Sequence, residues 1–239
     1  MRLAVTASER ALAAFAAALA ERLASASAAA SDEGTAAALR EFARLVESID
    51  STVREKAAAA PASRLPVCRF LDAALADASG AVGSLAGALS ALAPALAWTQ
   101  NPNYRRQPPD ARFLANYGYA VIAGPADGPP ALVNDARLAL GVLLLGPGTH
   151  YPLHGHPAAE VYYTLTPAGE WWRGTGPWRQ EPPGAAIYHA PNVPHATRAG
   201  ALPVLAVYLW RGDLDIHARL AGADRSTPPG PAPASPAAR

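Results

Sequence analysis

The stretch that decides the fold is GTHYPLHGHPAAEVY, residues 148–162. His154, His156, Glu160 and Tyr162 have the same parity, so a strand with a period of two would project all four from one face. Burying two imidazoles, a carboxylate and a phenol without partners would be unfavourable by several kcal/mol. A divalent transition metal resolves this conflict, because imidazole nitrogen and carboxylate oxygen are ligands for first-row metals.

Histidine is confined to the second half of the chain. All six histidines lie between positions 150 and 217, and residues 1–98 contain none. His195, in the segment PNVPH, follows the quoted stretch at a distance that suits a neighbouring strand. We therefore expect His195 to supply the fourth ligand.

Composition and hydrophobic spacing divide the chain into four segments. Residues 1–98 have apolar positions at helical spacing, with Thr35 as a predicted N-cap of the second helix. Residues 99–116 form a polar, proline-rich connection. Short β-prone runs separated by Gly and Pro clusters fill 117–216 and predict a sandwich or small barrel. Residues 217–239 form a C-terminal extension, predicted to be disordered from 226.

The five β-prone runs are all rich in apolar residues. They are 117–123, 138–145, 161–165, 185–189 and 204–210.

Charge and cysteine content exclude several classes of protein. The 239 residues carry a formal net charge of +1, so no basic excess favours nucleic acid as a partner. One cysteine forms neither an internal disulfide nor a Cys-rich zinc site. No stretch reaches the 18 uncharged apolar residues of a membrane span. The Ala-rich N-terminus favours an amphipathic helix over a cleaved signal, and we expect a cytoplasmic protein without a membrane partner.

The spacing around the quoted stretch resembles the first motif of the cupin superfamily, G-x5-H-x-H-x3-E. Gly176, Pro182 and Gly184 match the opening of the second cupin motif, which ends in a histidine, here His195. The resemblance implies an α+β protein: an N-terminal helical segment followed by a cupin barrel, that is, a double-stranded β-helix or jelly roll.

A finer pattern is similar to the cupin-type dimethylsulfoniopropionate (DMSP) lyases. It comprises residues 151–162, the segment IYHAP at 187–191, PHA at 194–196 and YLWRG at 208–212. The resemblance implies that Tyr162 is the catalytic base and that Tyr151 helps to place the substrate.

The same resemblance implies cleavage of DMSP to dimethyl sulfide and acrylate. Three neutral histidines, one glutamate and a divalent cation sum to +1, which suits a substrate carboxylate. The metal is iron, manganese, zinc or nickel, since all accept these ligands. Aromatic faces suit the sulfonium end, and we expect Trp178 and Tyr208 to bind it, with His189 in the pocket wall.

Two other functions use the same features. A metal-dependent cupin oxygenase of a small carboxylate or phenol could have the same ligand set. A cupin sensor of the anti-sigma type also joins a helical half to a cupin half, but its helical half usually binds zinc through His and Cys. Several apolar strand faces are also compatible with a homodimer.

Overall fold

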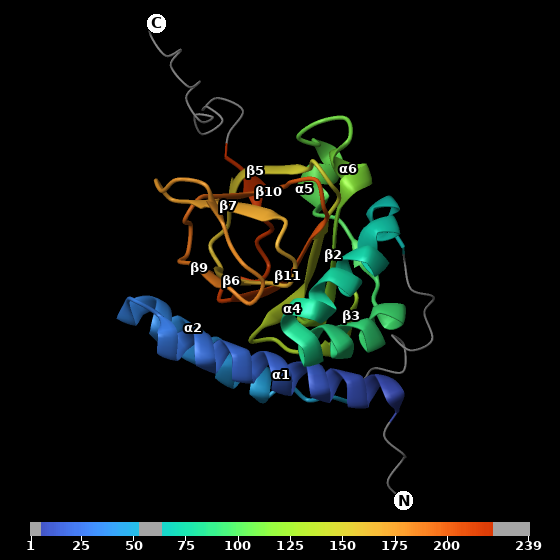
Figure 1. Cartoon of the computed structure of the whole chain (residues 1–239), viewed down its shortest axis with the longest axis vertical. Helices are drawn as coiled ribbons and strands as arrows, with labels where there is room; N and C mark the ends of the chain where they lie inside the picture. Colours follow the sequence, from blue (N-terminus) through green and yellow to red (C-terminus); the bar gives the residue numbers. More distant parts are fainter. Residues whose placement is uncertain (1–5, 53–63, 222–239) are drawn as a thin grey trace, which may run out of the picture.

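The computed structural model describes residues 6–52 and 64–221. Helices precede two β-sheets, and Figure 1 shows the long helices on one side of the strands. The helical elements are α1 (Ala7–Ala29), α2 (Glu33–Glu47), η1 (Pro66–Phe70), α4 (Leu71–Leu92), η2 (Ala93–Ala95), α5 (Pro102–Arg106) and α6 (Phe113–Asn116).

The larger sheet, which we call sheet A, has the order β1-β2-β4-β11-β6-β9, with β3 paired to β2. Its pairs are antiparallel except for β2 with β3. The strands are β1 (Trp98–Thr99), β2 (Tyr117–Gly124), β3 (Ala131–Asn134), β4 (Ala139–Leu145), β6 (Ala159–Thr164), β9 (Ala186–His189) and β11 (Val204–Arg211).

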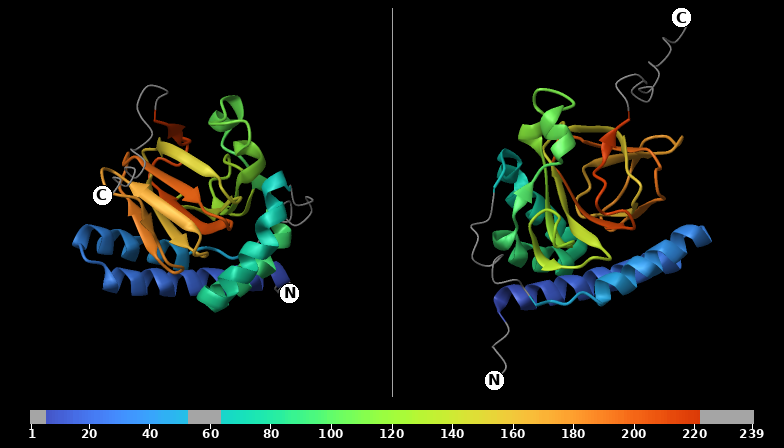
Figure 2. Two further views of the ribbon diagram at one scale, coloured as in Figure 1. Left: turned by 45° about the horizontal axis from the view of Figure 1, so that its top comes forward. Right: turned by 180° about the vertical axis from the view of Figure 1, so that it is seen from behind.

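The smaller sheet, sheet B, has the order β12-β5-β10-β7-β8 and is antiparallel throughout. Its strands are β5 (His150–Gly155), β7 (Gly169–Arg173), β8 (Arg179–Gln180), β10 (His195–Ala199) and β12 (Arg219–Leu220). Figure 2 shows the two sheets facing each other. The α+β class with a cupin-type pair of sheets is confirmed; among the described residues the sheets do not join into a closed hydrogen-bonded barrel.

Sheet A has a core on each face because its side chains alternate. On β11, Leu205, Val207 and Leu209 pack with the buried residues of α1, α2 and α4, whereas Val204 and Ala206 lie in a second cluster that faces sheet B. The helical segment therefore covers the outer face of sheet A, and the inner face is left for the site.

The helices differ from the sequence prediction in two details. The N-cap of α2 is Asp32, whose carboxylate accepts a hydrogen bond from the backbone N–H of Thr35, so Thr35 is the third residue of the helix and not its cap. The apolar spacing of residues 66–92 also predicts two successive helices, whereas Leu71–Leu92 form one long helix, α4, which is kinked at Gly83, where φ is +39°. Arg22 of α1 donates to the backbone carbonyl of Val82 beside this kink.

Two helical stretches, Ala7–Ala29 and Pro66–Ala95, are long and apolar enough to cross a membrane by length and composition alone. Core helices of soluble proteins and signal sequences meet the same criterion, so this is weak evidence. In α1 the apolar stripe that includes Leu12, Phe15 and Leu19 is fully buried in the core shared with sheet A.

Some elements lie outside the segments expected for them. The predicted connection at 99–116 contains α5 and α6, and β12 pairs with β5 from within the predicted C-terminal extension. The part of that extension predicted to be disordered, from residue 226, lies outside the described residues.

Candidate metal centre

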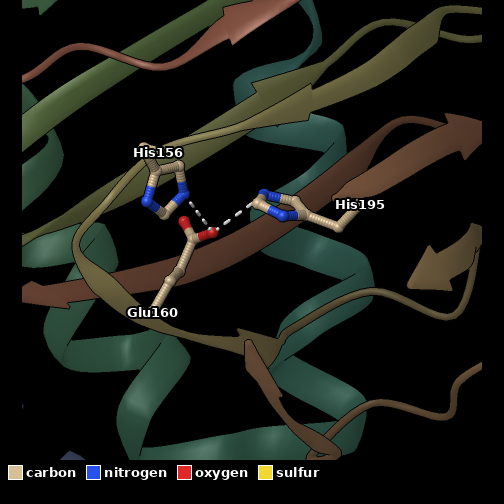
Figure 3. Close-up of side chains that lie close together, drawn as sticks. All are labelled: His156, Glu160 and His195. Atoms are coloured by element: carbon tan, nitrogen blue, oxygen red, sulfur yellow. Dashed lines mark hydrogen bonds and ion pairs between the residues drawn. The ribbon is translucent and has the colours of Figure 1, made fainter. Parts of the chain in front are cut away.

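Three of the predicted ligands meet between the two sheets. His156 Nε2 and His195 Nε2 each lie 3.0 Å from Oε2 of Glu160. Figure 3 shows both rings pointing at the carboxylate, which β6 supplies, while His195 comes from β10. One ligand atom from each residue lies within 4.8 Å of the others, and all three side chains are buried. The group therefore has the size of a single-ion site.

The hydrogen bonds of the rings indicate the form of each imidazole. Nδ1 of His154, His156 and His195 lies 2.8, 3.0 and 2.9 Å from the backbone carbonyl of a residue two positions away. A carbonyl only accepts, so Nδ1 carries the proton, and in a neutral ring Nε2 then presents a lone pair. Metal-binding histidines are oriented in this way.

With neutral rings, this arrangement would set Nε2 lone pairs against the Glu160 carboxylate. The Nε2 atoms of His156 and His195 face Glu160 at hydrogen-bond distance, and His195 Nε2 has no hydrogen-bond partner among the described residues. In a neutral ring whose proton is on Nδ1, Nε2 cannot donate to the carboxylate. A divalent cation among the three groups removes the repulsion and satisfies every lone pair, so these residues fit a transition-metal ion.

Glu160 is held as a carboxylate. Burial alone raises the pKa of this group, but the His156 ring and then His195 outweigh burial and place the pKa well below its ordinary value. Its second oxygen, Oε1, accepts a hydrogen bond of 2.6 Å from Trp210 Nε1. The Trp210 ring also stacks on His156, with centroids 3.9 Å apart.

The Trp210 contact was not predicted as part of the site. Its signals in the sequence were its place in the segment YLWRG and its parity with Tyr208 on the last long strand, which puts both side chains on one face. Trp210 pairs directly with Glu160 across β11 and β6.

His154 lies next to the group of three but outside it. It is opposite His195 in the register of β5 and β10, and the two rings are 4.1 Å apart. Burial, followed by His195, lowers the pKa of His154 well below its ordinary value, so this ring is neutral. The His154 ring also stacks on Tyr151, with ring centroids 3.9 Å apart.

The predicted single strand through the four same-parity residues is wrong. The chain leaves β5 after Gly155 and enters β6 at Ala159, in the other sheet. Pro157 has no N–H to donate to a ladder, which suits this break. The side chains converge because the two strands face each other, and not because they share one strand face.

Tyr151 reaches the same interior through an irregularity. In the pairing of β5 with β10, His154 is opposite His195 while Tyr151 is opposite Thr197, so three residues of one strand match two of the other. This bulge turns an odd-numbered and an even-numbered side chain to the same side. Tyr151 is 4% exposed, and its hydroxyl lies 3.2 Å from that of Tyr104.

A cavity of about 490 Å³ opens onto the carboxylate side of the site. Its lining includes Tyr151, Glu160, Tyr162, Tyr208 and Trp210. Burial, followed by the Glu160 charge, raises the pKa of Tyr162 well above its ordinary value. In the protein without metal, Tyr162 is therefore a neutral phenol beside a carboxylate.

The residues predicted to contact the substrate do not all line the same cavity. Tyr151 and Tyr208 line the first cavity, but His189 lines a second one of about 640 Å³. Trp178 lines neither cavity and instead lies under the Arg198 guanidinium, 4.3 Å from its ring centroid, beside His150.

His189 is buried without polar partners. Its ring stacks on His195 with centroids 4.2 Å apart, and neither ring nitrogen has a hydrogen-bond partner among the described residues. Burial, followed by His195, lowers its pKa well below the ordinary value. His189 is thus a neutral ring packed behind a candidate ligand.

Comparisons with known proteins agree on one family. The family model described as dimethylsulfoniopropionate lyase matches residues 37–206. The chain is 41% identical over 78 residues to dimethylsulfoniopropionate lyase DddQ of Ruegeria pomeroyi, covering 33% of this chain and 39% of that protein. It is 34% identical over 134 residues to a putative dimethylsulfoniopropionate lyase, DddL, of Cereibacter sphaeroides, covering 56% of this chain and 53% of that one. The matches thus span about half or less of each curated relative.

Solved structures extend the likeness to most of the chain. The crystal structure of DMSP lyase DddQ from Ruegeria pomeroyi has a TM-score of 0.56 and 25% identity, covering 70% of this chain and 83% of the other. A structure from the work on the DMSP lyases RdDddP and RnDddQII has a TM-score of 0.59 and 26% identity, covering 78% and 95%.

Proposed function

Because the chain belongs to the dimethylsulfoniopropionate lyase family, we propose that it cleaves DMSP to dimethyl sulfide and acrylate by β-elimination. The observation that carries the proposal is the buried Tyr162, which lines the same cavity as Glu160 of the candidate metal centre. A proton acceptor, a site for a carboxylate and space for a small molecule therefore occur together.

His156, Glu160 and His195 would hold the metal, with His154 beside them as the fourth candidate ligand. When bound, the cation supplies a Lewis acid that stabilises negative charge developing at the substrate α-carbon and favours the phenolate form of Tyr162. Iron, manganese, zinc and nickel all suit these donors.

The phenolate of Tyr162 takes the proton from the α-carbon of DMSP. The electron pair of that C–H bond forms the double bond of acrylate, and the pair of the C–S bond leaves with sulfur as neutral dimethyl sulfide. No general acid is needed, because the leaving group departs uncharged. The proton stays on Tyr162 until it is released to solvent.

Tyr151 orients the substrate in this proposal. It stacks on His154 and lies at hydrogen-bond distance from Tyr104, so two contacts fix its ring. Tyr151 lines the same cavity as Tyr162, which supports a role in fixing the carboxylate end of the substrate before proton transfer.

Headspace gas chromatography tests the function. Purified protein treated with a chelator, and the same protein reloaded with each of the four metals, would be incubated with DMSP. We expect dimethyl sulfide only from reloaded protein. No release with any metal would overturn the proposed substrate, and oxygen uptake with iron would favour the oxygenase. Cytoplasmic location and a homodimer stay predictions.

A further inference from the structure

Two tyrosines from different strands form one wall of the cavity. Tyr119 of β2 and Tyr208 of β11 both line it, and their rings meet edge to face with centroids 6.0 Å apart. Tyr208 is 9% exposed. The two rings contact each other, whereas the hydroxyl of Tyr208 has no hydrogen-bond partner among the described residues.

Gly141 explains how the Tyr208 ring reaches Tyr119. Gly141 of β4 is opposite Tyr208 in the sheet, on the strand between β11 and β2. A Cβ at position 141 would lie 2.5 Å from the Tyr208 hydroxyl oxygen and 2.6 Å from Cε1. The ring therefore lies across the bare backbone of Gly141, directed away from Tyr162 and toward β2.

The distance between strands suits the two ends of a small zwitterion. Tyr208 pairs with Tyr162, and Trp210 with Glu160, across β11 and β6. Neighbouring strands lie about 4.8 Å apart. In DMSP the sulfur is three bonds from the carboxylate carbon, which is a similar span. A carboxylate at Glu160 and its metal site would place the sulfonium over β11 and β4, against the tyrosine wall.

The charges of the cavity favour a cation. Asp127 and Asp215 line it with Glu160, and neither aspartate has an ion-pair partner in the described part of the chain. Arg105 is the arginine of the lining. Aromatic faces attract a sulfonium or quaternary ammonium group through the negative face of the ring.

We propose that Tyr119 and Tyr208 form the subsite for the positively charged end of the substrate. The proposal rests on the proposed function for the identity of the substrate. The aromatic wall selects zwitterions with an onium group three bonds from a carboxylate, and rejects carboxylates of the same length that end in an uncharged group.

The test uses two halves of the substrate as probes. Trimethylsulfonium and acrylate would each be titrated into the metal-loaded protein and followed by NMR, with the variants Tyr208→Leu and Tyr119→Leu. We expect trimethylsulfonium affinity to fall about tenfold in each variant, since a cation–aromatic contact has about this effect. Acrylate affinity should stay within about twofold of wild type. Tyr188→Leu, which removes a half-buried tyrosine outside this cavity, is the matched control and should change neither.

Unchanged trimethylsulfonium affinity in both variants, with circular dichroism showing intact folds, would overturn the proposal. An equal loss of affinity for trimethylsulfonium and for acrylate would also overturn the proposal, because it would indicate a general collapse of the cavity. Tyr208→Phe keeps the aromatic face if the leucine variant fails to fold, and should retain trimethylsulfonium binding. Trimethylsulfonium binding does not depend on turnover. Absence of dimethyl sulfide from wild type would therefore reject the lyase function, whereas the binding titration would still decide whether the two tyrosines form a cation subsite.

Discussion

Trp210 and the two histidines contact different oxygens of the Glu160 carboxylate. Trp210 Nε1 donates a hydrogen bond of 2.6 Å to Glu160 Oε1, while Oε2 lies 3.0 Å from Nε2 of His156 and of His195. A hydrogen bond from a residue that is not itself a ligand fixes the orientation of a metal-binding carboxylate. The Trp210 ring also covers His156. One side chain thus supports two of the three groups at the candidate centre.

Trp210→Phe removes this hydrogen bond and keeps a ring against His156. We expect metal affinity to fall by about 10- to 100-fold, the usual effect of losing such a contact, with the fold intact. Competition with a fluorescent chelator measures the change. Trp172→Phe, on a half-buried tryptophan away from the three-residue group, is the control, and equal affinity loss in both variants would contradict the prediction.

The three histidines should not be equivalent. His156→Ala and His195→Ala each remove a member of the group around Glu160, and we expect the purified variants to contain no stoichiometric metal. His154→Ala removes a ring outside that group and should retain metal with reduced affinity. Elemental analysis after dialysis decides this, with His150→Ala as control. Full metal content in His156→Ala would contradict the assignment.

His189→Phe should stabilise the protein. Two buried ring nitrogens without partners are unfavourable by about 1–3 kcal/mol each, and phenylalanine retains the stack on His195. We expect a higher free energy of unfolding in urea by about 1–3 kcal/mol. His189→Ala, which leaves a hole behind His195, should destabilise. A loss of stability in His189→Phe as large as in His189→Ala would show that the nitrogens have partners in solution.

Stability of the metal-free protein should depend on pH on both sides of neutrality. Burial lowers the pKa of His189 and His154 from 6.5, so the unfolded chain binds more protons below that pH and stability falls on acidification. The buried tyrosines have pKa values above 10, so stability also falls above that pH. Thermal unfolding should give the highest Tm between about pH 7 and 9. A constant Tm from pH 7.5 to 5 would contradict this, and His189→Phe should flatten the acid side.

The five apolar runs predicted from the sequence correspond to β2, β4, β6, β9 and β11 of sheet A, and no such run was predicted for the strands of sheet B. Sheet A is covered by helices outside and by sheet B inside, so its strands are nearly continuous apolar runs. β5, β7 and β10 carry charged or polar side chains, such as the ion pair of Glu170 and Arg198 on the outer face and His154 or His195 inside. Hydrophobic periodicity detects the first kind of strand and not the second.

The composition of the site was more predictable than its geometry. Residue types and spacing pointed to His156, Glu160 and His195, because a buried set of this kind requires a cation. Parity could not predict Tyr151, since a bulge between paired strands has no sequence signature here. Trp178 was expected at the substrate, but Arg198 and His150, from paired strands, hold it elsewhere. Such contacts between distant segments depend on the tertiary fold.

Tyr162→Phe tests the central claim most directly, that Tyr162 removes the α-proton at a metal-dependent site. Dimethyl sulfide release from DMSP and from DMSP deuterated at the α-carbon would be followed for wild type and variant, both with measured metal content. The account predicts a primary isotope effect for wild type, and for Tyr162→Phe full metal content with release at least about 100-fold slower. Release by Tyr162→Phe within a few-fold of wild type would contradict the account.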